Sequence, residues 1–165
     1  MANTRETLAI VLRMLRIGGA ACDVSGGWAE ELLGLREPWK HGDIDLVLQG
    51  NTFERVDELM TRLGGSVCEV PQKRFAHKRA FVFRQTLCEI TRIGGDEMQP
   101  VTHYWGDVPF FWHPPLLHDK PVVLNGETIT VLSAANLEKH RLHWQETQPH
   151  RWRDPRSLVM PLQVI

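Results

Sequence analysis

The sequence has no long apolar run and no excess of charge of either sign. No apolar run in its 165 residues approaches the roughly 18 that a membrane-spanning helix needs. Its 19 Lys and Arg residues nearly balance its 20 Asp and Glu residues, which gives a formal net charge of -1. Proteins that bind nucleic acid without sequence preference carry a basic excess, and proteins of membrane surfaces carry a polybasic block. We therefore expect neither a membrane nor nucleic acid as a partner.

Cysteine is also scarce, with three residues in the chain. Cys22, Cys68 and Cys88 each lie in an apolar, strand-like run, so we expect them to be reduced and buried. The first residues enter an amphipathic pattern and do not form the apolar core of a signal peptide. These features favour a cytoplasmic protein.

Apolar periodicity predicts alternating helices and strands. A capping box at Asn3 and Glu6 opens the first helix, which Gly18 ends. Further helices are expected over 28–33, 52–63 and 133–146, strands over 20–24, 43–48, 66–70, 77–83 and 86–93, and a hairpin around Asn125-Gly126. Residues 94–120 show no clear period and are expected to be irregular. The chain has no internal repeat and no linker, so we predict one α/β (α+β) domain over residues 1–165, with a mixed sheet flanked by helices.

Two aspartates mark the strand at 43–48. Because side chains alternate along a strand, Asp43 and Asp45 share one face, while Ile44 and Leu46 point to the other, into the expected core. Two ionised carboxylates on one face repel each other, and a divalent cation removes that repulsion. The competing interpretation is the solvated face of an edge strand.

Two glycines precede these aspartates, in the run Ser25-Gly26-Gly27. Small residues at a strand-to-helix turn let the backbone approach a phosphate closely, and the first N–H groups of the next helix supply donors. A pair of glycines alone is equally typical of a plain turn. Its position before an Asp-x-Asp strand makes phosphate binding the stronger hypothesis.

The two motifs together resemble the minimal nucleotidyltransferases of the polymerase-β superfamily. The sequence looks most like their small lincosamide and aminoglycoside-2″-adenylyltransferase type. The matching residues are Gly26-Gly27-Trp28-Ala29, the acid Glu31, and the run His41-Gly42-Asp43-Ile44-Asp45-Leu46. The dense match covers residues 24–48. Ser133 and Lys139 resemble the C-terminal pattern of the family, and Arg151 to Leu158 resemble its tail loosely.

Members of this family carry a third carboxylate on a later strand. Glu89 is the best candidate, because an unpaired carboxylate on a strand face that is expected to be buried is costly without a partner. Many members have Asp there, and Glu89 could instead be an exposed surface charge. Glu69, beside Pro71, is the competing candidate.

The resemblance implies a Mg²⁺-dependent nucleotidyltransferase that moves a nucleotidyl group, AMP from ATP in the first instance, to a hydroxyl of a small molecule, with antibiotics among the candidates. It implies that Asp43 and Asp45 hold Mg²⁺ against the triphosphate, and that Glu89 binds a second Mg²⁺ or takes the proton of the attacking hydroxyl. The implied phosphate contacts are Ser25, Gly26, Gly27, Lys40 and His41. Short relatives often build the acceptor site across a two-fold axis, so the resemblance also implies a homodimer.

Two other functions stay open at this stage. The Glu at the third position, and Trp39 where some relatives carry a basic residue, motivate a degenerate protein that binds nucleotide or a protein partner without turnover. The third hypothesis is a nucleotidyltransferase that modifies protein or tRNA, although the nearly neutral net charge argues against an RNA substrate. His113, His118 and Asp119 match no zinc spacing. The tryptophans of the C-terminal part, at 105, 112, 144 and 152, are either core residues or part of an acceptor pocket.

Overall fold

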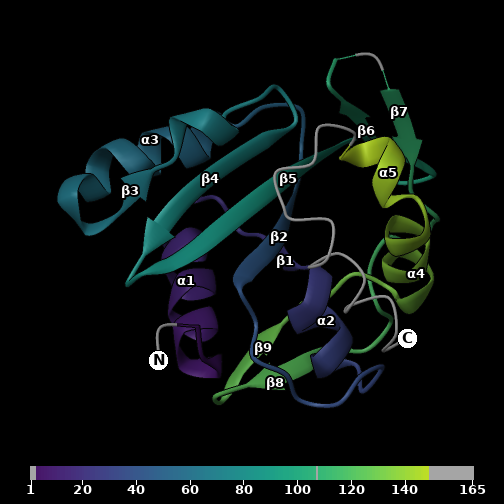
Figure 1. The fold of residues 1–165 in the computed structure, drawn as a ribbon, viewed down its shortest axis with the longest axis horizontal. Coiled ribbons are helices and arrows are strands. Elements are labelled where there is room, and N and C mark those ends of the chain that lie inside the picture. The colour runs from purple at the N-terminus through teal and green to yellow at the C-terminus, as the bar shows by residue number, and fades with distance from the viewer. Residues whose placement is uncertain (1–2, 107, 149–165) are drawn as a thin grey trace.

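A mixed sheet forms the centre of the computed structural model, which describes residues 3–106 and 108–148 (Figure 1). The strand order is β1-β2-β5-β4-β3, with β6 paired to β5 and β7 paired to β6. The β2–β5 pair is parallel, and the other pairs in this sheet are antiparallel. The strands are β1 (Asp23–Val24), β2 (Asp43–Gln49), β3 (Cys68–Glu69), β4 (Lys78–Phe83), β5 (Thr86–Asp96), β6 (Gln99–Tyr104) and β7 (Val108–Phe111).

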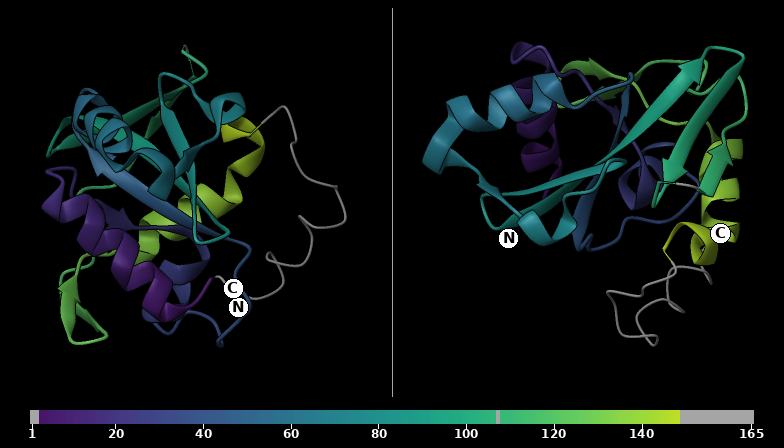
Figure 2. Two further views of the ribbon diagram at one scale, coloured as in Figure 1. Left: turned by 90° about the vertical axis from the view of Figure 1, so that its left-hand side faces the viewer. Right: turned by 90° about the horizontal axis from the view of Figure 1, so that it is seen from above.

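Helices and one separate hairpin surround this sheet. The helices are α1 (Arg5–Ile17), α2 (Gly26–Leu32), α3 (Glu54–Leu63), α4 (Ala134–Leu142) and α5 (Trp144–Thr147), with 3₁₀ turns η1 (Gly64–Ser66) and η2 (Pro71–Lys73). The hairpin pairs β8 (Val122–Leu124) with β9 (Glu127–Ile129). α1 and α3 lie on the same side of the sheet, whereas α4 and α5 lie at its other end (Figures 1 and 2). None of the described helices combines the length and apolarity that a membrane crossing requires.

The core forms where the apolar stripe of α1 packs against the sheet. Leu8, Val11 and Leu15 on this helix are fully buried, as are Ile44 and Leu46 on β2, within one continuous apolar cluster. Burial of each such side chain contributes about 1.5–3 kcal/mol. The face of β2 that carries Ile44 is therefore anchored in the core, which fixes the opposite face as the one that carries Asp43 and Asp45.

The structure confirms the mixed sheet with helices and most of the predicted elements, and corrects several details. The first helix is capped by Thr4, whose hydroxyl accepts from the Thr7 N–H at 3.1 Å, and not by Asn3. The Asn3 amide instead donates to the carbonyl oxygens of His41 and Asp43, at 3.0 and 2.9 Å. Asn3 therefore holds the entry to β2, a long-range contact that a local capping pattern does not reveal.

The segment 94–120, expected to be irregular, contains β6 and β7 and the end of β5. The buried side of β6 is formed by Pro100, Thr102 and Tyr104. Because two of these are not strongly apolar, their alternation leaves little hydropathy signal. The Thr102 hydroxyl donates to the Arg92 carbonyl oxygen at 2.7 Å and accepts from the Trp112 indole at 3.0 Å, which is how a polar residue is accommodated here.

Other expectations differ at element ends. The strand expected over 20–24 is only Asp23–Val24, α2 begins at Gly26 rather than at residue 28, and the helix expected over 133–146 is divided at His143. Cys68, expected to be buried, is exposed because β3 is a two-residue strand at the edge of the sheet. The tail motif from Arg151 to Leu158 lies outside the described residues.

Candidate active site

The parallel pairing of β2 and β5 brings three carboxylates together. Asp43 stands opposite Leu87, and Asp45 stands opposite Glu89, so all three acids point from the same face of neighbouring strands. One oxygen from each of Asp43, Asp45 and Glu89 lies within 4.8 Å of the others. The aspartates are half-buried and Glu89 is buried. The alternative third acid, Glu69, is on β3, two strands away from Glu89, and its carboxylate pairs with Arg74 at 2.6 Å.

Two lysines hold Glu89. Lys73, from η2, makes a short ion pair with its carboxylate, and Lys78, from β4, lies 3.4 Å from the same oxygen. Burial alone opposes ionisation of Glu89, but the charges and hydrogen bonds of Lys78 and Lys73 outweigh it and hold the pKa of Glu89 below its usual range. The third acid is therefore a charged, positioned group and not a surface charge.

The first residues of α2 lie against Asp45 and His41. Gly26 has a φ of +60°, and a Cβ at this position would come within 2.4 Å of Asp45 Oδ2. The Ser25 N–H donates to the Asp45 carbonyl oxygen at 2.9 Å. A Cβ on Gly27 would lie 2.9 Å from His41 Nδ1. Gly26 is thus needed for the turn and for close approach to Asp45, whereas Gly27 is needed for close approach to His41.

His41 is enclosed by protein groups. Its Nε2 lies 2.7 Å from Glu31 Oε2, and its ring packs on the Trp28 indole at 4.0 Å between ring centres. The carboxyl of Glu31 is partly desolvated, which alone raises its pKa, but hydrogen bonds from His41 and Arg5 outweigh that effect and lower the pKa. The ring of His41 still borders the cavity described next, so it stays within reach of a ligand there.

A cavity of 230 Å³ opens in front of the aspartates, bordered by α2, the loop before β2, and α4. Its basic residues are Arg36, Lys40, His41, His140 and Arg141. Glu30 of α2 is 2% exposed and forms an ion pair with Arg141 of α4 and another, at 3.3 Å, with Arg36. Sequence reasoning missed this cluster, because residues 111 positions apart meet there only after α4 packs on α2.

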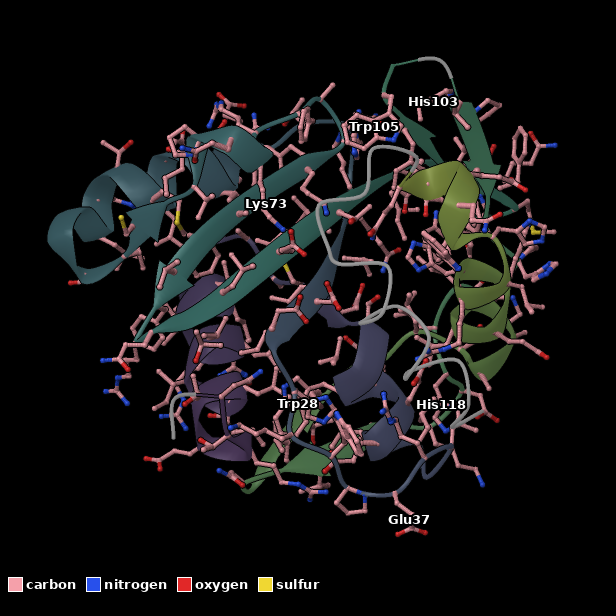
Figure 3. The ribbon with its side chains drawn as sticks, viewed as in Figure 1. Trp28, Glu37, Lys73, His103, Trp105 and His118 are labelled. Carbon is pink, nitrogen blue, oxygen red and sulfur yellow. The ribbon has the colours of Figure 1, made fainter. Side chains whose placement is uncertain are left out.

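A second cavity, of 110 Å³, shares Asp45 and Gly26 with the first. Lys73 and Lys78 border it together with an aromatic wall that includes Phe75, His77 and Trp105. Lys73 and Trp105 both lie in the upper part of the view in Figure 3, whereas Trp28, which belongs to α2, lies below them. Of the late tryptophans, 105 and 112 border this cavity and Trp144 borders the first, while Trp152 lies outside the described residues.

The carboxylate cluster fits a magnesium ion. Mg²⁺ prefers oxygen ligands and is usually held by one or two carboxylates together with substrate phosphates, and three carboxylates converge here. The neighbouring thiol, Cys88, points from the opposite face, and burial together with Asp43, Asp45 and Glu89 raises its pKa to about 12. Cys88 therefore stays protonated, and the cluster presents hard oxygen donors.

Comparison with solved structures places this arrangement in a known fold. The chain is similar to the antibiotic-resistance factor ANT(2″)-Ia, solved in complex with adenylyl-2″-tobramycin. The match covers 96% of this chain and 85% of the other, with a TM-score of 0.64 and 16% identity. This chain has the fold of the minimal nucleotidyltransferases. It is also similar, over 99% of its length and 98% of the other chain, to the lincosamide antibiotic adenylyltransferase LnuA bound to lincomycin, with a TM-score of 0.64 and 13% identity.

A third likeness, to a proposed nucleotidyltransferase from Thermotoga maritima, covers 96% of this chain and 91% of that one, with a TM-score of 0.57 and 18% identity. No protein-family model and no curated protein sequence matches the chain significantly. The nucleotidyltransferase fold implied by the sequence resemblance is thus confirmed by structure, at identities where sequence comparison alone finds no match.

Proposed function

We propose that this protein is a Mg²⁺-dependent nucleotidyltransferase that transfers AMP from ATP to a hydroxyl of a small molecule. The observation that carries the proposal is the meeting of Asp43, Asp45 and Glu89 beside the glycine turn of α2. Magnesium bound there would neutralise charge on the triphosphate and on the attacking and leaving oxygens. The carboxylates of Asp43 and Asp45 are the groups that would hold it.

The other residues then bind and position the reactants. Gly26, Gly27 and Ser25 face the β- and γ-phosphates, and Lys40 and His41 add contacts from the rim of the first cavity. The acceptor oxygen attacks the α-phosphorus, the bond to the bridging oxygen breaks, and pyrophosphate leaves. Glu89, ionised and oriented by its lysines, accepts the hydroxyl proton or contributes to a second ion site.

The test is a direct one. Purified protein is incubated with Mg²⁺, each nucleoside triphosphate and a panel of hydroxyl acceptors. The panel includes tobramycin and lincomycin, because the two similar antibiotic enzymes were solved with adenylyl-2″-tobramycin and with lincomycin. Release of pyrophosphate together with an adenylylated product supports the proposal. Absence of both nucleotide binding and pyrophosphate release across the panel contradicts it.

A second candidate is a nucleotide-binding protein without turnover. The observation in its favour is the pairing of Glu89 with two lysines, since both cations compete with a metal ion for that carboxylate. Measurement of nucleotide affinity in parallel with turnover separates the two functions. Tight Mg²⁺-dependent binding with no product over the whole acceptor panel favours the binding protein.

We also propose a homodimer and a cytoplasmic location. Exposed apolar side chains such as Ile17, Val123 and Leu142 provide surface for self-association. The cysteines are all free, which suits a reducing compartment. Sedimentation at micromolar concentration tests the dimer, and a strict monomer contradicts it.

A further inference from the structure

The second cavity lies where an acceptor has to enter. Asp45 and Gly26 border both cavities, so the two spaces meet at the proposed reaction centre. In phosphoryl transfer the attacking and leaving oxygens are roughly in line, on opposite sides of phosphorus. If the triphosphate occupies the first cavity, beside the glycines, the attacking oxygen arrives from the second. This step rests on the proposed function.

The wall of the second cavity consists of aromatic rings that contact one another. Phe75 stacks on His77 at 5.5 Å between ring centres, and Trp105 meets these two rings edge-on at 4.7 and 4.8 Å. The indole of Trp105 donates to the Thr147 carbonyl oxygen at 3.0 Å. Burial, with smaller contributions from Lys78 and Arg92, lowers the pKa of His77 to about 4, so its ring is neutral near pH 7.

Trp105 adopts a backbone conformation that a tryptophan rarely takes. Its φ is +59°, in the left-handed region that favours glycine. A residue with a Cβ is strained in this region, because its Cβ comes close to the following carbonyl oxygen. Such strain persists where surrounding contacts impose it, and it concentrates at ligand-binding sites. The position of the Trp105 ring at the cavity wall is therefore maintained against a local cost.

If a metal ion neutralises the aspartates, the remaining charged side chains at the second cavity carry a net positive charge. Among the described residues that border it, Asp45 is the one acid, whereas Lys73 and Lys78 supply two ammonium groups. Glu89 balances one of these two positive charges, and Asp45 belongs to the proposed metal site. Counted over these described side chains alone, about one positive charge is left to face the space in front of the aromatic wall.

The first cavity offers no unpaired acid either. Besides the two aspartates, Glu30 is the one acid among the described residues that border it, and Arg141 and Arg36 pair with it. An acceptor with several ammonium groups therefore finds, among the described residues, no carboxylate outside the proposed metal site and the Glu30 ion pairs, and it meets Lys73 and Lys78 in the second cavity. Like charges at close range disfavour such binding, and the penalty is larger in a partly desolvated cavity than in water.

We propose that the second cavity, between Lys73, Lys78 and the ring of Trp105, is an acceptor site for hydroxyl compounds that carry a flat apolar group and a neutral or negative charge. Compounds with several amines are excluded. The aromatic wall selects the flat group by stacking, and the lysines select the charge. This departs from the aminoglycoside-2″ part of the sequence resemblance, since tobramycin is a polyamine.

A matched set of probes tests both parts of this assignment. Two of the probes are p-nitrophenyl β-glucoside and p-nitrophenyl β-glucuronide. The third, called the amine below, is the same glucoside with an aminomethyl group in place of its hydroxymethyl group. They share the aryl ring and the sugar ring, and they differ only in the group at C6 of the sugar, which is neutral, negative or positive. Their dissociation constants are measured from the indole N–H resonances of the protein, in the presence of Mg²⁺ and a non-hydrolysable ATP analogue.

We expect the glucuronide to bind most tightly and the amine most weakly. Their dissociation constants should differ about tenfold, which is the effect of one charge contact of this kind. Trp105→Gly removes the ring and also suits the positive φ, so it should fold and weaken all three probes. Lys73→Gln should reduce the difference between glucuronide and amine. Phe111→Ala, which removes an exposed ring that borders neither cavity, is the matched control and should change nothing.

Three results overturn the assignment: the amine binding tightest, Trp105→Gly leaving affinity unchanged, or none of the probes binding to protein that holds the nucleotide analogue. Binding of the analogue is measured separately, by calorimetry. A failure of the analogue to bind contradicts the proposed function itself. A normal affinity for the analogue combined with the wrong probe order contradicts only the acceptor assignment.

Discussion

The contact between Gly26 and Asp45 leads to a sharp prediction. In Gly26→Ala the new Cβ would lie 2.4 Å from Asp45 Oδ2 and 2.8 Å from Asp45 Cβ. These separations are far inside van der Waals contact, so the Asp45 side chain or the start of α2 must move. We expect Gly26→Ala to lose metal and nucleotide binding while the fold survives.

The magnitude has two parts, and the chain offers a control for one of them. A Cβ at φ +60° costs about 1–2 kcal/mol, and displacement of a packed side chain adds about 1–3 kcal/mol. Gly34 has a similar φ of +71° with open space around the position of a Cβ. Gly34→Ala should therefore show the backbone cost alone, without displacement of Asp45.

Stability is measured by urea denaturation. Binding is measured by calorimetric titration of the protein with the ATP analogue in the presence of Mg²⁺. We expect Gly34→Ala to lose about 1–2 kcal/mol of stability and to keep its affinity. Gly26→Ala should lose more stability than Gly34→Ala, together with at least about tenfold in nucleotide affinity, or 1.4 kcal/mol. Equal nucleotide affinities in the two variants would refute the argument that the turn positions Asp45.

Three further predictions follow from the same contacts. Asp45→Asn should abolish Mg²⁺-dependent nucleotide binding yet raise the melting temperature without metal, because it relieves repulsion within the carboxylate cluster; a lower melting temperature contradicts this. Because the pKa of His77 is lowered to about 4 from 6.5, the unfolded chain binds its proton first, so stability should fall as the pH drops from about 6.5 to 4. His77→Phe should flatten that part of the profile of unfolding free energy against pH, and an unchanged profile argues against a neutral, buried His77. Glu30→Ala leaves Arg36 and Arg141 without their shared carboxylate and should cost about 3–5 kcal/mol in urea denaturation, whereas a loss below about 1 kcal/mol would show that water already screens this pair.

Short-range patterns predicted the elements whose signals are local. The hairpin around Asn125-Gly126 formed as expected, because both residues adopt the positive φ that a tight turn between two strands requires. The break of the last helix at His143 and the strands within 94–120 were missed. The strands within 94–120 include polar buried residues such as Thr102, whose hydroxyl donates to the Arg92 carbonyl oxygen, so a hydropathy pattern does not reveal them.

The site divides in the same way. Strand alternation and turn geometry are local properties of the chain, so the amino-acid order alone predicts that Asp43 and Asp45 share a face and that glycines precede them. The position of Asp45 opposite Glu89 is known from the folded sheet alone, since the register of two parallel strands depends on packing over the whole sheet. The lysines that pair with Glu89 and the second cavity depend on that register. A local sequence pattern therefore could not predict the positive charge beside the carboxylates.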